Sequence, residues 1–182
     1  MRTLTAGALV SVLLLGFSAA GNFVFAQVRS NDNRIAIMDN CLPGDPGWNP
    51  TGGCAQDPQH GDVPFAEFGA LLTSPLTIPP NGFVIGHPSW RNEPSYLSVD
   101  SGTSVHVTNS GGRTHTFTEV ANFGGGFVGA LNIGLSQAPE CNPAAVVQLL
   151  PGARDEVNGL APGLHKFQCC IHPWMRAAIR VN

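Results

Sequence analysis

The sequence predicts an all-β fold. Apolar and polar residues alternate in residues 96–99 and again in 105–108, which is the period-two pattern of strands that bury one face. Turn formers separate such segments, since the 182 residues include 22 Gly and 15 Pro. With 43% apolar residues, the chain is long enough for one well-buried domain with additional segments.

Residues 1–26 have the organisation of a secretory signal peptide. A basic start at Arg2 precedes an apolar run over residues 6–17, and Val24-Phe25-Ala26 provides a cleavage signal. The run is short and rich in Gly and Ala for a membrane span, and a retained N-terminal anchor is the alternative. We expect a periplasmic or secreted protein without stable membrane insertion after the signal is removed.

Residues 27–80 are expected to form an irregular N-terminal extension of the domain. Residues 41–54 are nearly all turn formers with a cysteine at each end. A disulfide closing this loop would stabilise it by about 3 kcal/mol through the entropy of the unfolded chain. Trp48 is interpreted as a lid on the domain. The pattern in residues 63–72 leaves helix and strand equally open.

The domain itself is assigned to residues 81–182. A first strand is expected around Phe83–Gly86, and His60 and His87 are assigned surface or capping positions. The two alternating segments of residues 96–107 predict two strands joined by a turn at Ser101-Gly102, with His106 facing solvent. His115 follows a loop of turn residues, 109–112, where binding residues are often found.

The second half of the domain is expected to end in a hairpin. Residues 123–129 lack the Lys-Ser/Thr ending of a phosphate-binding loop and are interpreted as a crossover. Residues 146–150 predict a short strand. After Pro162-Gly163, alternation places His165, Phe167 and Cys169 on the inner face of a strand, with Lys166 and Gln168 on the other face. Residues 177–181 predict the last strand.

The hairpin loop, FQCCIHPWMR, carries the chemistry of the chain. It places Cys169, His172 and Met175 at the spacing C-x-x-H-x-x-M, which supplies a thiolate, an imidazole and a thioether. Soft sulfur ligands select copper over magnesium, calcium or manganese, and imidazole suits copper as well. A trigonal His2Cys site with an axial Met needs a second histidine, for which His115 is the candidate.

These segments resemble the cupredoxins, the small blue copper proteins of the plastocyanin and amicyanin type. The resemblance covers PSYLSVDSGTSVHVTNSGGRTHTF and APGLHKFQCCIHPWMRAAIRV, about residues 94–182. It implies a Greek-key β-sandwich that holds one copper ion. His115, Cys169 and His172 would be the strong ligands and Met175 the axial one.

The resemblance also implies a function and an assignment for the cysteines. The protein would be an electron carrier rather than an enzyme. His172 would lie at the surface as the electron port, and Pro173 and Trp174 would belong to a docking patch for redox partners. Packing of Trp174 beneath the loop is the alternative. A copper thiolate at Cys169 would account for the odd cysteine among five. The remaining cysteines would then form the disulfides Cys41–Cys54 and Cys141–Cys170. A simple free thiol or a bond between Cys169 and Cys170 is the alternative.

Two departures from the family concern the hydrogen bonds around the site. Cys170 stands where many members have a small hydroxyl residue, and Thr116 stands where plastocyanin-like proteins often have Asn. The potential and the spectral type depend on such contacts.

Other functions remain as alternatives. A periplasmic copper storage or delivery protein would use the same ligands, and a zinc-stabilised or structural domain would need only Cys and His. A copper enzyme would need a second copper centre, and the sequence has no H-x-H or HCH cluster to supply one. The net charge of −3 at pH 7 and the absence of a basic cluster argue against nucleic-acid binding, and we expect a monomer.

Overall fold

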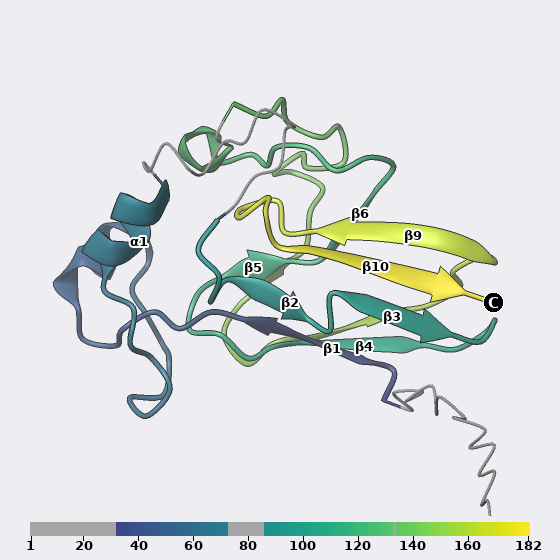
Figure 1. Cartoon of the computed structure of the whole chain (residues 1–182), viewed down its shortest axis with the longest axis horizontal. Coiled ribbons are helices and arrows are strands. Elements are labelled where there is room, and N and C mark those ends of the chain that lie inside the picture. The colour runs from purple at the N-terminus through teal and green to yellow at the C-terminus, as the bar shows by residue number, and fades with distance from the viewer. Residues whose placement is uncertain (1–31, 73–85, 133) are drawn as a thin grey trace, which may run out of the picture.

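Two four-stranded sheets pack face to face in the computed structural model, which describes residues 32–72, 86–132 and 134–182 (Figure 1). One sheet has the order β2-β1-β4-β8 and the other β3-β10-β9-β6, while β5 and β7 form a separate pair. The strands are β1 (Arg34–Met38), β2 (Arg91–Glu93), β3 (Tyr96–Val99), β4 (Val105–Asn109), β5 (His115–Thr116), β6 (Thr118–Val120), β7 (Gln148–Leu149), β8 (Arg154–Val157), β9 (Gly163–Gln168) and β10 (Arg176–Val181). The helical segments are η1 (Pro46–Thr51), α1 (Phe65–Leu72) and η3 (Gly129–Leu131).

The core lies between the sheets, where alternate residues of each strand point inward. Every second residue of β3, β4 and β10 is buried, as the period-two pattern predicts. Phe117 and Phe167 stack at 4.6 Å between ring centroids. The buried apolar side chains of both sheets form one cluster. The predicted strands in residues 96–107 and the predicted C-terminal hairpin are therefore confirmed.

The connections make this a Greek-key sandwich, as expected. β9 and β10 form an antiparallel hairpin, whereas β10 also pairs with β3 in parallel and β1 pairs with β4 in parallel. Strands that follow each other in sequence lie in opposite sheets at β2–β3, β3–β4 and β8–β9. Such crossings close the two sheets over a common core.

The N-terminal extension differs from the irregular segment expected for it. Residues 34–38 form β1, an inner strand between β2 and β4, and Ile35 and Ile37 are fully buried. The alternation in RIAIM was the signal for this strand. β8 was also missed, because none of its residues is fully buried and a polar edge strand gives no apolar period.

The part of the extension from residue 39 to residue 72 covers one end of the sandwich. Residues 65–72 form helix α1, which settles the open choice between helix and strand in favour of a helix. Figure 1 shows α1 at the end of the sandwich where the loop between β9 and β10 turns, opposite the C-terminus. The signal segment 1–26 and most of the strand expected at residues 83–86 lie outside the described residues.

Gln168 is buried, although its strand pattern placed it on an outer face. Described residues between 121 and 146 pack in a small apolar cluster with Val120 and Cys170, and Gly124 N donates a hydrogen bond of 3.0 Å to the Gln168 side-chain oxygen. Residues 123–129 form no strand of either sheet, which agrees with a crossover. The predicted strand 146–150 is shorter in the structure, with only Gln148–Leu149 paired.

Two disulfides stabilise the segments outside the sheets. Cys41 is bonded to Cys54 and Cys141 to Cys170, which are the pairs expected from the sequence. Cys169 is a free and buried thiol. Within the described ranges, no helix combines the length and the apolar character needed to cross a membrane.

Candidate metal centre

Three candidate ligands meet at the end of the sandwich that α1 covers. His115 begins β5, Cys169 follows β9, and His172 lies in the loop before β10. The sulfur of Cys169 lies 3.7 Å from Nδ1 of His115 and 3.7 Å from Nδ1 of His172. The three donor atoms lie within 4.8 Å of one another, in the one such group of His, Cys, Asp or Glu among the described residues. This arrangement could hold a metal ion.

Backbone hydrogen bonds fix the loop around Cys169, and two amides donate to its sulfur. Cys169 N donates to Met175 O at 3.0 Å and Met175 N to His172 O at 2.9 Å, which closes a tight turn. The amides of Thr116 and His172 each lie 3.4 Å from the Cys169 sulfur and donate to it. Amide donors of this kind stabilise a thiolate relative to a thiol.

The hydroxyl of Thr116 joins the two ligand segments. Its Oγ1 accepts a hydrogen bond of 2.7 Å from Cys170 N, the amide directly after the Cys169 ligand candidate. Thr116 and Cys170 are the two positions where the sequence departs from the family pattern. The contact between the segments is therefore made by these two residues.

The charges of the cluster are coupled through Cys169. Burial alone would raise the pKa of the Cys169 thiol, but hydrogen bonds and charge from His115 and His172 hold it well below its usual value. Burial alone would lower the pKa of His115, but Asp39 and Cys169 raise it to about 9. Burial lowers the pKa of His172. These shifts favour a thiolate at Cys169, a protonated His115 and a neutral His172.

Asp39 is the site residue that the sequence analysis missed. Its Oδ2 lies 2.7 Å from Nε2 of His115, and neither side chain has any exposed surface. Burial works against a charged Asp39, yet the hydrogen bond and charge of His115 and the amides of Arg113 and Cys41 lower its pKa. Its only signal in the sequence is an acid directly after the alternating segment RIAIM.

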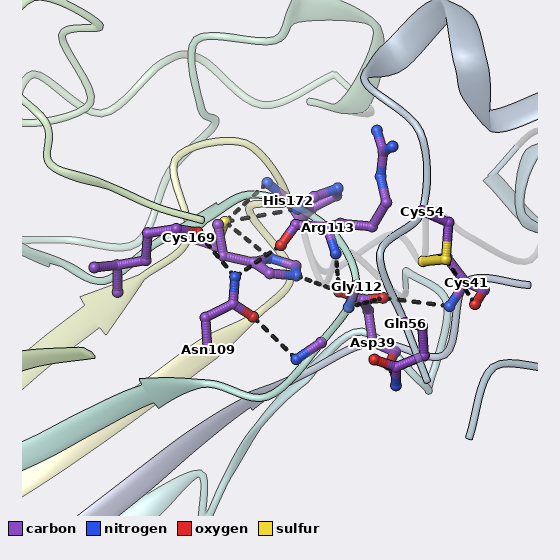
Figure 2. A network of polar contacts seen from close by, with 12 residues as sticks. Asp39, Cys41, Cys54, Gln56, Asn109, Gly112, Arg113, Cys169 and His172 are labelled. Atoms are coloured by element: carbon purple, nitrogen blue, oxygen red, sulfur yellow. Dashed lines mark hydrogen bonds and ion pairs between the residues drawn. A yellow bond between two sulfur atoms is a disulfide. The ribbon is translucent and has the colours of Figure 1, made fainter. Parts of the chain in front are cut away.

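The loop before His115 has a defined conformation. The Asn109 amide donates to Arg113 O at 2.7 Å and to Leu149 O at 2.8 Å, while its oxygen accepts from Gly111 N (Figure 2). Gly112 packs so closely that a Cβ there would lie 2.5 Å from Gln56 N. A side chain at this position would displace the stapled extension or the His115 loop.

Met175 lies in the core, and its role as axial ligand stays a prediction. The side chain is 1% exposed and belongs to the main apolar cluster. Its backbone contacts with Cys169 and His172 place it in the same turn as these two residues.

Only a small part of His172 reaches the surface, and its role as electron port stays a prediction. It is 5% exposed, Pro173 is buried, and Trp174 is partly buried. The ring of His172 has Trp174 at 5.5 Å, Phe68 at 6.3 Å and Trp90 at 6.5 Å between centroids. The extension supplies part of this cover, which the resemblance alone did not include.

We call the rings over His172 the aromatic cap. Phe68 is at its centre, 4.7 Å from Trp90, 5.3 Å from Trp48 and 6.1 Å from Trp174. The members of the cap are Trp48, Phe65, Phe68, Trp90 and Trp174. Trp48, interpreted as a lid, is 2% exposed and packs inside the cap.

The other histidines lie outside the cluster. His60 and His106 are exposed, as expected. His87 is 5% exposed and not on the surface, because it packs against Phe68 and Trp90. Its Nδ1 accepts a local hydrogen bond from Ser89 N, which agrees with a capping position. His165 lies 2.6 Å from Glu119 Oε1, which raises its pKa and supports a structural role.

The donor set suits copper. One thiolate and two imidazoles in a buried cluster are the strong ligands of mononuclear copper sites that transfer single electrons, and zinc accepts the same donors. Fold and site thus define a β-sandwich protein with a buried His2Cys centre.

The solved structures similar to this chain include cupredoxins. A purple cupredoxin from Nitrosopumilus maritimus is 22% identical, with a TM-score of 0.38, over 58% of this chain and 95% of that protein. A reduced mutant of amicyanin is 20% identical, with a TM-score of 0.34, over 50% of this chain and 71% of that one. A copper-containing nitrite reductase from Thermus scotoductus SA-01 is 24% identical, with a TM-score of 0.34, over 50% of this chain and 20% of the reductase. No protein-family model and no curated protein matches the sequence.

Metal uptake is expected to release about one proton at pH 7. His115 has a pKa of about 9 and is protonated at this pH, whereas the lowered pKa values of Cys169 and His172 favour a thiolate and a neutral imidazole. The metal competes with the His115 proton, so the apparent affinity should rise about tenfold per pH unit from about pH 7 to 9 and then level off. Zn(II) titrations against a chelator of known affinity measure this slope. An affinity that is flat across the range would contradict the protonated His115.

Proposed function

We propose that this protein is an exported cupredoxin that holds one copper ion and carries single electrons between redox proteins. The observation that supports it best is the buried cluster of His115, Cys169 and His172, with both Nδ1 atoms 3.7 Å from the sulfur. Bound copper would supply a Cu(II)/Cu(I) couple, with Met175 proposed as the weak axial ligand.

The residues of the chain would limit rearrangement during electron transfer. Amides of Thr116 and His172 donate to the Cys169 sulfur, and Thr116 Oγ1 binds Cys170 N. Because the ligands lie on strands and a closed turn, they can keep one geometry in both oxidation states. The aromatic cap covers most of His172, and we propose that electrons leave through Trp174, the partly buried member of this cap beside His172.

A storage or delivery protein would use the same ligands but needs a route for the metal. The exposures of His115, Cys169 and His172 are 0%, 0% and 5%. Such a closed site favours retention of the ion over transfer to an acceptor. An electron carrier is the better fit because electrons, unlike ions, cross a few ångströms of packed side chains.

Export is supported by the cysteines and the N-terminus. Two disulfides coexist with one free, buried Cys169, a state that suits an oxidising compartment. Together with the signal-like residues 1–26, this supports a periplasmic or secreted location. We propose redox proteins as partners of a monomeric chain.

The test is the visible and EPR spectrum of the mature protein loaded with Cu(II), beside Cys169→Ala. We expect an intense thiolate-to-copper charge-transfer band that reductant bleaches and that the variant lacks, because the band requires the sulfur ligand. The other four cysteines are paired in two disulfides, Cys41–Cys54 and Cys141–Cys170, so they offer no thiolate that could produce the band in the variant. A missing band in the wild type, with zinc held more tightly than copper, would refute the electron-carrier proposal.

A second measurement separates a carrier of electrons from a carrier of copper. Cu(I)-loaded protein is mixed with an oxidised redox protein, and in parallel with a Cu(I) chelator. An electron carrier should be oxidised rapidly while its copper stays bound. Rapid loss of copper with slow oxidation would favour delivery.

A further inference from the structure

We propose that Asp39 is a positioning residue that fixes His115 for the metal and biases the copper centre toward Cu(II). The inference rests on the proposed copper site and adds a residue to it. Asp39 directly follows β1, 76 residues before His115, and contacts Nε2 of the imidazole, whereas Cys169 lies next to Nδ1.

The contacts of Asp39 select one form of His115. Nε2 of His115 faces Asp39 Oδ2 at 2.7 Å, and Nδ1 faces the Cys169 sulfur at 3.7 Å. A carboxylate accepts but does not donate, so the proton of a neutral imidazole stays on Nε2. The lone pair of Nδ1 is then available to the metal, and the ring becomes a stronger donor.

The carboxylate is itself held in place by three backbone amides. Oδ1 accepts from Gly112 N at 3.1 Å and from Cys41 N at 3.3 Å, and Oδ2 accepts from Arg113 N at 3.0 Å. Gly111 allows this approach, because a Cβ there would lie 2.1 Å from Asp39 Oδ2. With His115, four donors fix both oxygens, so the side chain has little freedom to rotate away.

The stapled loop reinforces the same contact. Arg113 crosses from the His115 loop to this segment, where its guanidinium donates to Thr51 O and Gly53 O and lies over the ring of Trp48. This cation offsets part of the Asp39 charge. The carboxylate nevertheless lies 2.7 Å from Nε2 of His115, and the Asp39 side chain has no exposed surface.

A buried negative charge next to a ligand favours the oxidation state of higher positive charge. The interaction is strong because the effective dielectric constant in such a site is far below that of water. Cu(II) therefore gains more from Asp39 than Cu(I) does, and the reduction potential is lowered. A tenfold change in this preference corresponds to 59 mV for one electron.

The test compares Asp39→Asn with Asp62→Asn in the copper-loaded protein. Asparagine keeps the size and one oxygen but removes the charge, and Asp62 is an exposed acid of the same extension that loses the same charge. We expect the reduction potential of Asp39→Asn to rise by about 59 mV or more, which corresponds to a loss of about tenfold in the preference for Cu(II) over Cu(I). The potential of Asp62→Asn should stay close to that of the wild type. Equal potentials in the two variants would overturn the role of Asp39.

Nitrogen-15 NMR of the wild-type Cu(I) protein needs no variant. The proton of His115 should be found on Nε2 in a strong hydrogen bond, and an unprotonated Nε2 would overturn the inference even if Asp39→Asn fails to fold. Failure of the two proposals is distinguishable. A wild type without a charge-transfer band refutes the copper carrier, whereas a normal band with unshifted potentials refutes only Asp39.

Discussion

Replacing Phe68 by alanine is expected to expose His172 and to speed the loss of bound metal. Phe68 is 5% exposed and contacts three indole rings of the aromatic cap as well as the edge of His172. Truncating a buried phenylalanine costs about 3–5 kcal/mol of the free energy of unfolding. If only about 1.4 kcal/mol of this loss lowers the free energy of local opening of the cap, the population of the opened state increases about tenfold.

The measurement is the rate at which a chelator removes copper, or zinc as a redox-inert substitute, at a fixed temperature well below unfolding. Leu97→Ala is the matched control, because Leu97 is 2% exposed and lies in β3 opposite Ile179 of β10 rather than in α1, and its truncation costs about 2–5 kcal/mol. We expect at least about tenfold faster extraction from Phe68→Ala than from Leu97→Ala. Equal rates would show that the cap does not control access.

Removal of the Cys41–Cys54 bond is expected to destabilise both the extension and the His115 loop. The bond closes a separation of 13 residues, for which the chain-entropy estimate is about 3 kcal/mol. The loop that it closes contains Thr51 and Gly53, whose carbonyl oxygens accept from Arg113. Loss of the bond should therefore weaken the contacts that keep residues 111–113 against Asp39.

Hydrogen exchange in the double variant Cys41→Ser with Cys54→Ser measures this effect. The amides of Gly112 and Arg113, which bind Asp39, should exchange at least about tenfold faster than in the wild type. The double variant Cys141→Ser with Cys170→Ser is the comparison, since its bond closes a separation of 29 residues and lies beside Cys169 and Thr116 rather than beside Asp39. Faster exchange of these two amides in both variants alike would contradict a specific link between the staple and the site.

Local patterns predicted the elements that depend on neighbouring residues. The alternation around Leu97, Val105 and Ile179 indicated strands, because a strand that buries one face must place apolar residues at every second position. The spacing C-x-x-H-x-x-M put Cys169 and His172 in one turn, so the nearness of these two side chains followed from the loop alone. β1 had the same alternation, but its turn-rich surroundings concealed it.

Contacts between distant segments were beyond such patterns. Asp39 and His115 are 76 residues apart, and nothing in the sequence around either residue encodes the parallel pairing of β1 with β4 that brings them together. The cover of His172 by Phe68 likewise depends on where α1 docks. An apolar position in a helix predicts burial but not the surface against which the residue packs.

The sequence by itself thus predicted an all-β fold, and its resemblance to a family added the expected disulfide pairs and a cysteine and two histidines suited to one metal ion. Only the tertiary structure decided that Asp39 binds the outer nitrogen of His115 and that an aromatic cap closes over His172. The physical reason is that donor type and strand period are properties of short segments. The charge and the solvent around a metal ligand instead depend on which distant segments the folded core brings against it.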